Sequence, residues 1–174
     1  MKDRNKFRNK ERDSQNMTDS DMMFMREALS LARRCLDDRE APVGCVIAAD
    51  GRIVGTGRNR RETDKNALAH AEIEAINAAC AAMGGWRLDM CDLYVTLEPC
   101  PMCAGAIVNA RVRRVFYGAA DPKAGALGGL FDLLAYPVNH KPEVTGGLLA
   151  AESAALLSGF FRELREEKKG NNPG

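Results

Sequence analysis

The chain has 174 residues, of which 45% are hydrophobic and 28% charged, and its formal net charge at pH 7 is +1. This length suits one domain and is short for two, and no apolar run approaches the ~20 residues that a membrane span needs. A charge this close to zero does not by itself mark a nucleic-acid-binding protein. The opening MKDRNKFRNKERDSQN lacks the apolar stretch of a secretory signal, so we expect a cytoplasmic protein whose six cysteines are reduced and available to a metal.

Charged residues dominate the start of the chain. Residues 1–20 contain a single aromatic side chain, Phe7, and cannot bury enough apolar surface to order themselves. We therefore predict a disordered polar extension over 1–20, a single domain over 21–169 and a flexible C-terminus over 170–174.

The rest of the chain alternates helix and strand signals. A first helix is expected from TDSD, where Asp19, Ser20 or Asp21 can cap it, and a β-hairpin in VGCVIAADGRIVGTGRN, with its turn at Asp50-Gly51. Parallel strands joined by helices bury both faces of their sheet, so we predict a three-layer α/β/α sandwich around one mixed sheet. The later elements expected are a helix in AHAEIEAINAACAAMGG, a strand in CDLYVTLEPC, a helix in CPMCAGAIVNAR, a strand in VRRVFYGA, a short strand around Val144 and a helix in AAESAALLSGFFRELREEKK.

Two short motifs indicate a metal site: AHAE, with His70, and PCPMC, with Cys100 and Cys103. Imidazole and thiolate are preferred zinc ligands, and the CxxC spacing lets both sulfurs reach one ion. Both motifs stand at the head of a predicted helix, so neighbouring strand-to-helix junctions would bring the three side chains together. Three protein ligands leave the fourth position open, as in catalytic zinc sites.

Glu72 helps to decide whether such a metal would be catalytic or structural. A glutamate beside metal-bound water can accept the water's proton and return it elsewhere. Residues two apart on a regular helix point to nearly opposite sides, so His70 and Glu72 can face one metal only from an irregular first turn. A structural site closed by Cys80, Cys91 or His140, or a pair of unrelated buried cysteines, is the alternative.

The combination HAE…PCxxC resembles the zinc signature of the cytidine deaminase-like superfamily. That signature is shared with cytosine, guanine and deoxycytidylate deaminases, but the resemblance to bacterial tRNA adenosine deaminases covers about residues 22–169. The Asp121–Gly129 loop and the Phe160-Phe161 tail favour tRNA as the substrate. The matching blocks are APVGCVI, GRNRRE, AHAEIEAI, LYVTLEPCPMCAGAIVNARVRRVFYGAADPKAGALGG, NH and ESAALLSGFFRELR.

The resemblance implies a hydrolase that converts adenosine to inosine at the wobble position of a tRNA anticodon loop, with one Zn²⁺ per chain. Zinc would activate the water that attacks C6 of a flipped-out adenine, and unpaired loop bases can be splayed out at little cost. The residues implied are His70, Cys100 and Cys103 as zinc ligands, Glu72 as the catalytic proton shuttle, and Asn59, Ala71, Pro99 and Asp121 as contacts to the base, its leaving group or the neighbouring RNA.

Partners are expected from charge and from the family. Basic residues on three segments could lie near one rim of the active site and bind phosphates, although solvated ends of helices and strands explain each cluster equally well. Family members are homodimers, and Ile107 and Val108 of the CxxC helix are candidates for an exposed apolar side. The basic residues are Arg58, Arg60 and Arg61, then Arg111, Arg113 and Arg114, and in the tail Arg162, Arg165, Lys168 and Lys169.

Two rival functions remain at this point. A deaminase of a free base or nucleotide, such as guanine, would share the zinc, Glu72 and the fold but would not need the basic tail after Phe161. A non-enzymatic binding module stabilised by zinc would give Glu72 no role.

Overall fold

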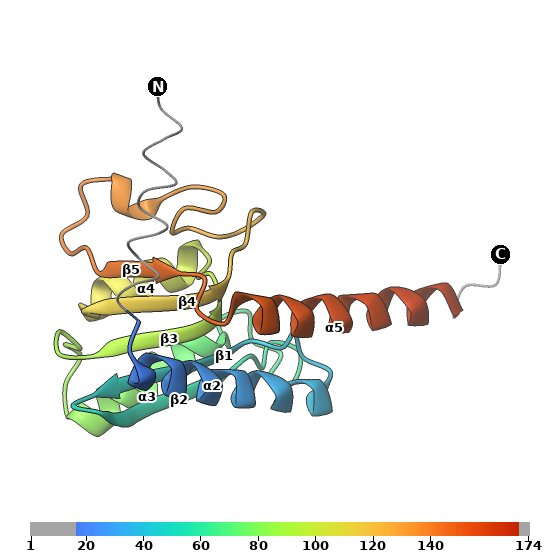
Figure 1. Cartoon of the computed structure of the whole chain (residues 1–174), viewed down its shortest axis with the longest axis horizontal. Coiled ribbons are helices and arrows are strands. Elements are labelled where there is room, and N and C mark those ends of the chain that lie inside the picture. Colours follow the sequence, from blue (N-terminus) through green and yellow to red (C-terminus); the bar gives the residue numbers. More distant parts are fainter. Residues whose placement is uncertain (1–16, 171–174) are drawn as a thin grey trace.

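A computed structural model describes residues 17–170 as one mixed sheet with helices on both faces (Figure 1). No helix in this range is long and apolar enough to span a bilayer. The elements in chain order are α2 (Asp19–Arg34), the 3-10 helix η1 (Leu36–Asp38), β1 (Gly44–Ala49), β2 (Arg52–Arg58), α3 (Ala71–Met83), β3 (Asp92–Leu97), α4 (Pro101–Ala110), β4 (Arg114–Ala119), the 3-10 helix η2 (Leu133–Ala135), β5 (Glu143–Gly146) and α5 (Ala150–Gly170).

The five strands lie in the order β2-β1-β3-β4-β5. β1 pairs antiparallel with both β2 and β3, whereas β3, β4 and β5 run parallel to one another. The predicted hairpin is therefore confirmed, and Asp50 and Gly51 both have positive φ in its turn. Because β2, β3 and β4 run in the same direction, the residues that follow them all lie at one edge of the sheet, the edge formed by the carboxyl ends of these three strands.

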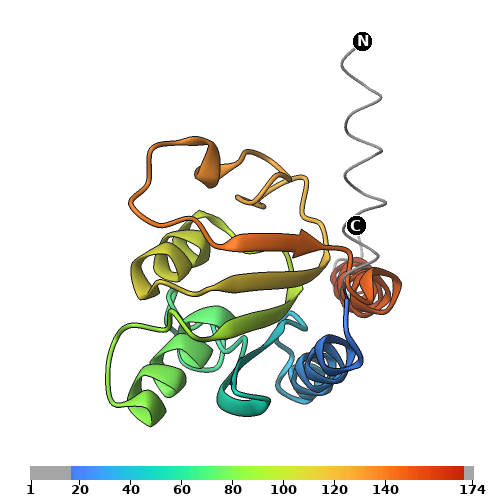
Figure 2. The ribbon, with the colours of Figure 1, turned by 60° about the vertical axis from the view of Figure 1, so that its left-hand side comes forward.

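Helices cover both faces of the sheet, which confirms the predicted three-layer architecture. In Figure 2, α2 and α5 lie on one side of the sheet and α3 and α4 on the other. The α2 face is built on an aromatic cluster in which Tyr94 stacks on Phe116 at 4.9 Å and contacts Phe24 at 5.2 Å. The other face buries the apolar sides of α3 and α4, including Ile107 and Val108. The expectation that these two residues form an exposed apolar side is wrong, because both pack into the core.

α3 lies unusually close to β2, because β2 carries glycine where the helix crosses it. A Cβ atom on Gly57 would overlap the Ala71 carbonyl oxygen and come within 2.6 Å of the Ala75 nitrogen. This contact places the start of α3 directly against the end of β2.

The boundaries of the domain differ slightly from those predicted. Thr18 is the N-cap of α2, and its side chain and that of Asp21 form a reciprocal capping box, so Asp19 and Ser20 are already helical. Of the extension predicted over 1–20, residues 1–16 lie outside the described residues, as do residues 171–174 of the C-terminus predicted over 170–174. In α5, Phe160 is buried but Phe161 is exposed, and the far half of the helix extends beyond the sheet (Figure 1).

Candidate active site

His70, Cys100 and Cys103 come together at the sheet edge where β2, β3 and β4 end. His70 is the N-cap of α3 and Cys100 the N-cap of α4, and neither side chain caps its helix. The His70 Nδ1 atom lies 3.8 Å from the Cys100 sulfur and 3.5 Å from the Cys103 sulfur, and all three ligand atoms lie within 4.8 Å of one another. The sequence-based expectation that two helix starts meet is therefore confirmed.

The donor set and its spacing suit a zinc ion. Tetrahedral zinc with ordinary Zn–S and Zn–N bonds places a sulfur and a nitrogen ligand ~3.5 Å apart, which matches both distances above. Within the described part of the chain, this is the sole group of three or more candidate ligands. The alternatives lie elsewhere: Cys80 contacts the Trp86 carbonyl, Cys91 precedes β3 at the opposite edge, and His140 Nε2 lies 2.7 Å from the Val112 carbonyl oxygen. The group therefore supplies three protein ligands.

The two cysteines have opposite ionisation tendencies. A hydrogen bond from the Cys103 thiol, helped by one from His70, lowers the pKa of Cys100 to about 4 despite its partial burial. The same Cys100 partner and burial raise the pKa of Cys103, and the hydrogen bond with Cys100 raises the pKa of His70. A metal requires thiolates and a neutral imidazole, so the lowered pKa of Cys100 favours metal binding, whereas the raised pKa values of Cys103 and His70 mean that binding would release protons from them.

Glu72 is buried beside this group. Its side chain is 4% exposed, and burial raises its pKa to about 7. It belongs to the first turn of α3, directly after the N-cap His70, as its proposed role requires. A buried carboxyl group that titrates near neutrality can both accept and donate a proton.

A cavity of about 180 Å³ opens onto these side chains. Residues from several elements that meet at this edge line the cavity. Asn59 follows β2, Ala71 begins α3, and Asp121 follows β4. The Ala71 nitrogen belongs to the first helical residue, where N–H groups have no partner in the helix. The lining residues are Ala41, Val43, Asn59, Arg61, His70, Ala71, Glu72, Leu97, Glu98, Cys100, Asp121 and Ala124.

The loop that carries Asp121 folds around Glu98, a residue that the sequence analysis did not select. Glu98 is 2% exposed, and its carboxylate accepts N–H bonds from Asp121 at 2.9 Å, Leu127 at 3.0 Å and Gly129 at 2.8 Å. The neighbouring Pro99 carbonyl oxygen accepts from the Ala126 nitrogen at 2.9 Å, which leaves one lone pair for a substrate.

The basic clusters do not all gather at the site. Arg113 and Arg114 hold Asp92 at the start of β3 and β4, which is the edge of the sheet opposite to the ligand group. The expectation that the cluster after the CxxC helix lies at the active-site rim is therefore wrong, because a ten-residue helix is ~15 Å long and its two ends lie at opposite edges. Arg61, in contrast, lines the cavity.

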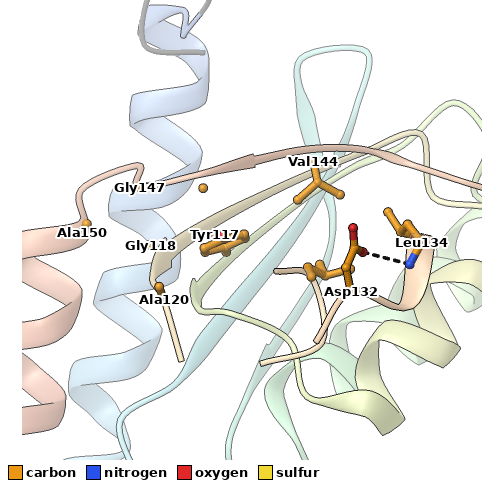
Figure 3. A pocket seen from close by; sticks show the side chains of 10 residues that line it. Tyr117, Gly118, Ala120, Asp132, Leu134, Val144, Gly147 and Ala150 are labelled. Atoms are coloured by element: carbon orange, nitrogen blue, oxygen red, sulfur yellow. Dashed lines mark hydrogen bonds between the residues drawn. The ribbon is translucent and has the colours of Figure 1, made fainter. Parts of the chain in front are cut away.

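A larger cavity, of about 510 Å³, lies between β4, β5, the start of α5 and the loop that contains η2 (Figure 3). Tyr117 and Val144 point into it, and Asp132 accepts the Leu134 N–H bond at its border. It contains none of the residues predicted for the site, so chemistry and not size identifies the smaller cavity as the candidate active site.

Comparisons with known proteins agree with this geometry. Residues 19–165 match the model of the MafB19-like deaminase family. Over 86% of this chain and 93% of the relative, the sequence is 48% identical to a tRNA-specific adenosine deaminase of Bacillus subtilis (strain 168). The chain belongs to the tRNA-specific adenosine deaminase family. The resemblance read from HAE…PCxxC and the blocks around it is thus confirmed.

Solved structures place the family members in the same fold. A structure from a study of A-to-I editing by tRNA:A34 deaminases at the wobble position of transfer RNA is 46% identical, with a TM-score of 0.74 over 78% of this chain and 99% of the other. A guanine deaminase from Bacillus subtilis is 40% identical, with a TM-score of 0.57 over 65% of this chain and 71% of the other. The cytidine deaminase-like fold expected from the sequence is therefore confirmed, and the agreement with the tRNA deaminase is more extensive.

Proposed function

We propose that this deaminase hydrolyses adenosine to inosine at the wobble position of a tRNA anticodon loop. The observation that carries the proposal is the convergence of His70, Cys100 and Cys103 at a cavity that the buried Glu72 also lines. The relatives' names and the wobble-editing structure support tRNA adenosine as the substrate. The guanine alternative has weaker support, because the guanine deaminase structures match at lower identity, 40% and 28%, and with lower TM-scores, 0.57 and 0.68, than the wobble-editing structure.

The three ligands would hold one zinc ion, which activates a water molecule as the nucleophile when it is bound. Glu72 then performs the proton transfers. It takes a proton from the attacking water and delivers it to N1 of adenine as the water oxygen bonds to C6. It then takes the remaining proton from the new hydroxyl group on C6 and gives it to the amino group as the C6–N bond breaks, so that water and adenosine yield inosine and ammonia. Burial of Glu72 keeps its proton in exchange with these atoms and away from bulk solvent.

Asn59 and the backbone at Ala71 and Pro99 would hold the base at the bottom of the cavity, and Asp121 would contact RNA at its rim. Arg61, on the rim, can meet a phosphate next to the target nucleotide. We also propose a cytoplasmic homodimer that binds the anticodon stem-loop. An unpaired loop is the substrate expected of a site that needs its base flipped out.

The test is incubation with an anticodon stem-loop that carries adenosine at the wobble position, followed by sequencing for inosine. Wild-type protein should produce inosine, and Glu72→Gln should lose on the order of 10²–10⁴-fold in rate while it keeps its zinc. Glu74→Gln is the matched control, because Glu74 lies two residues further along α3 but contacts Arg58 and Arg60. Deamination of free guanine with no inosine in RNA would support the alternative instead.

A further inference from the structure

Glu40 is a buried carboxylate next to the candidate active site that has no part in the steps above. It lies between η1 and β1 and is 1% exposed. One of its oxygens accepts the Asn59 Nδ2 group at 3.1 Å, and the other accepts the Thr63 backbone N–H at 2.7 Å. Both donors belong to the segment that follows β2, so both carboxylate oxygens are committed to the segment that carries Asn59.

We propose that Glu40 is a positioning residue that determines which end of the Asn59 amide faces the substrate base; this inference rests on the proposed function. A carboxylate can only accept hydrogen bonds, so the Nδ2 end of Asn59 must face Glu40. The Oδ1 atom and the second Nδ2 hydrogen are then the groups that remain for the cavity that Asn59 lines.

The rest of Asn59 has little freedom to move. Its backbone N–H donates to the Val43 carbonyl at 3.0 Å, and the Cys35 sulfur lies 3.4 Å from the Val43 carbonyl oxygen and 3.7 Å from that of Asn59. Burial raises the pKa of Cys35, so the thiol stays protonated and can donate to either of these carbonyl oxygens. A rotation of the terminal amide by half a turn is the remaining motion that exchanges its donor and acceptor, and Glu40 opposes it.

Amide orientation matters because a purine presents its ring nitrogens and exocyclic groups in a fixed order. A reversed amide would put a donor against a donor, or an acceptor against an acceptor, along the same edge of the base. A site built to hydrogen-bond one pattern rejects a base that leaves its buried polar groups unpaired. Glu40 would thus contribute to the preference for adenine without touching it.

Glu40→Gln tests the proposal with little change in shape. The Thr63 N–H can only donate, so the glutamine oxygen must face Thr63 and its NH₂ group must face Asn59. Asn59 then has to turn its oxygen toward position 40, which reverses the amide in the cavity. We expect kcat/KM for the anticodon stem-loop to fall about 10–100-fold, with zinc content and Tm close to wild type.

Two variants serve as comparisons. Glu40→Asp keeps an acceptor-only group, so it should retain more activity than Glu40→Gln even though the shorter side chain lowers Tm more. Glu62→Gln neutralises an exposed carboxylate in the same segment and should leave kcat/KM unchanged. A larger loss of activity in the aspartate variant than in the glutamine variant would indicate a packing role and overturn the proposal.

A double-mutant cycle with Asn59→Ala separates positioning from general support of the fold. If Glu40 acts through Asn59, then Glu40→Gln should change kcat/KM by less than about 3-fold once Asn59 is alanine. A full, multiplicative loss in the double variant overturns the proposal, as does loss of zinc or unfolding in Glu40→Gln. The proposed function fails separately, if wild-type protein makes no inosine in the same stem-loop.

Discussion

Glu98 is the residue around which the loop from Asp121 to Gly129 is folded, and Glu98→Gln tests how far that loop depends on it. The carboxylate accepts three backbone N–H bonds from the loop and is 2% exposed. A glutamine that keeps its oxygen toward Leu127 and Gly129 presents an NH₂ group to the Asp121 N–H. One charge-assisted bond is then lost and one N–H is left without an acceptor.

The expected loss of unfolding free energy is about 2–4 kcal/mol, from the hydrogen bond and the unpaired donor together. In a domain of this size ~1 kcal/mol shifts Tm by about 2–4 °C, so Tm should fall by about 5–15 °C. Because the loop carries Asp121, KM for the anticodon stem-loop should also rise. Thermal unfolding by calorimetry and steady-state kinetics on the same preparation measure the two effects.

Glu143→Gln is the control, since Glu143 is an exposed carboxylate in β5, and it should leave both quantities unchanged. A Tm and a KM that stay at wild-type values in Glu98→Gln would refute the reasoning. The loop would then be held by its remaining contacts, such as the Pro99 to Ala126 hydrogen bond.

Three further predictions follow from the same contacts. Cys103→Ser should abolish stoichiometric zinc binding whereas Cys80→Ser should not, and metal analysis showing that Cys80 is needed would mean a closed structural site. Burial alone would raise the pKa of Asp92, but the hydrogen bonds from Arg114 and Arg113 outweigh burial and lower the pKa. The ionised Asp92 therefore stabilises the fold above about pH 4, and this stabilisation is lost as the pH falls further. Urea denaturation across a pH series should therefore show a steeper acid loss in wild type than in Asp92→Asn, and parallel curves would contradict this. Gly57→Ala should reduce the unfolding free energy by about 2–3 kcal/mol or more, because its methyl group meets the backbone of α3, and an unchanged urea midpoint would show that α3 can move away.

The ligand group could be predicted because the relevant signals are local. His70 and the cysteine pair each stand at the start of a helix, and strands that run in the same direction bring such starts to one edge of a sheet. The Asp50-Gly51 turn likewise needs no information beyond its own residues. These features combine short-range patterns with a simple rule of topology.

Glu40 and Glu98 could not be found in this way. In LDDRE and LEPC they look like ordinary charged residues beside a turn, and their burial depends on partners 19 to 31 positions further along the chain. Most of those partners are backbone N–H groups, which have no signature in the sequence. The Arg113 and Arg114 error has a related cause, since proximity to the CxxC motif in sequence was taken as proximity in space.

The close packing of α3 on β2 joins two parts of the candidate site into one rigid block. Asn59 follows β2 and Glu72 lies in the first turn of α3, so the group that would hold the base and the group that would move its protons cannot shift independently. The loop after β4 is joined to the sheet edge in a different way, through hydrogen bonds to Glu98 and Pro99. Evolution, or a protein engineer, could therefore vary that loop to accept a different nucleic acid and leave the hydrolytic block unchanged. Libraries that aim at new substrates should diversify residues 122–134 except Gly125 and Gly129, which pack against Glu98, and should keep the glycines of β2.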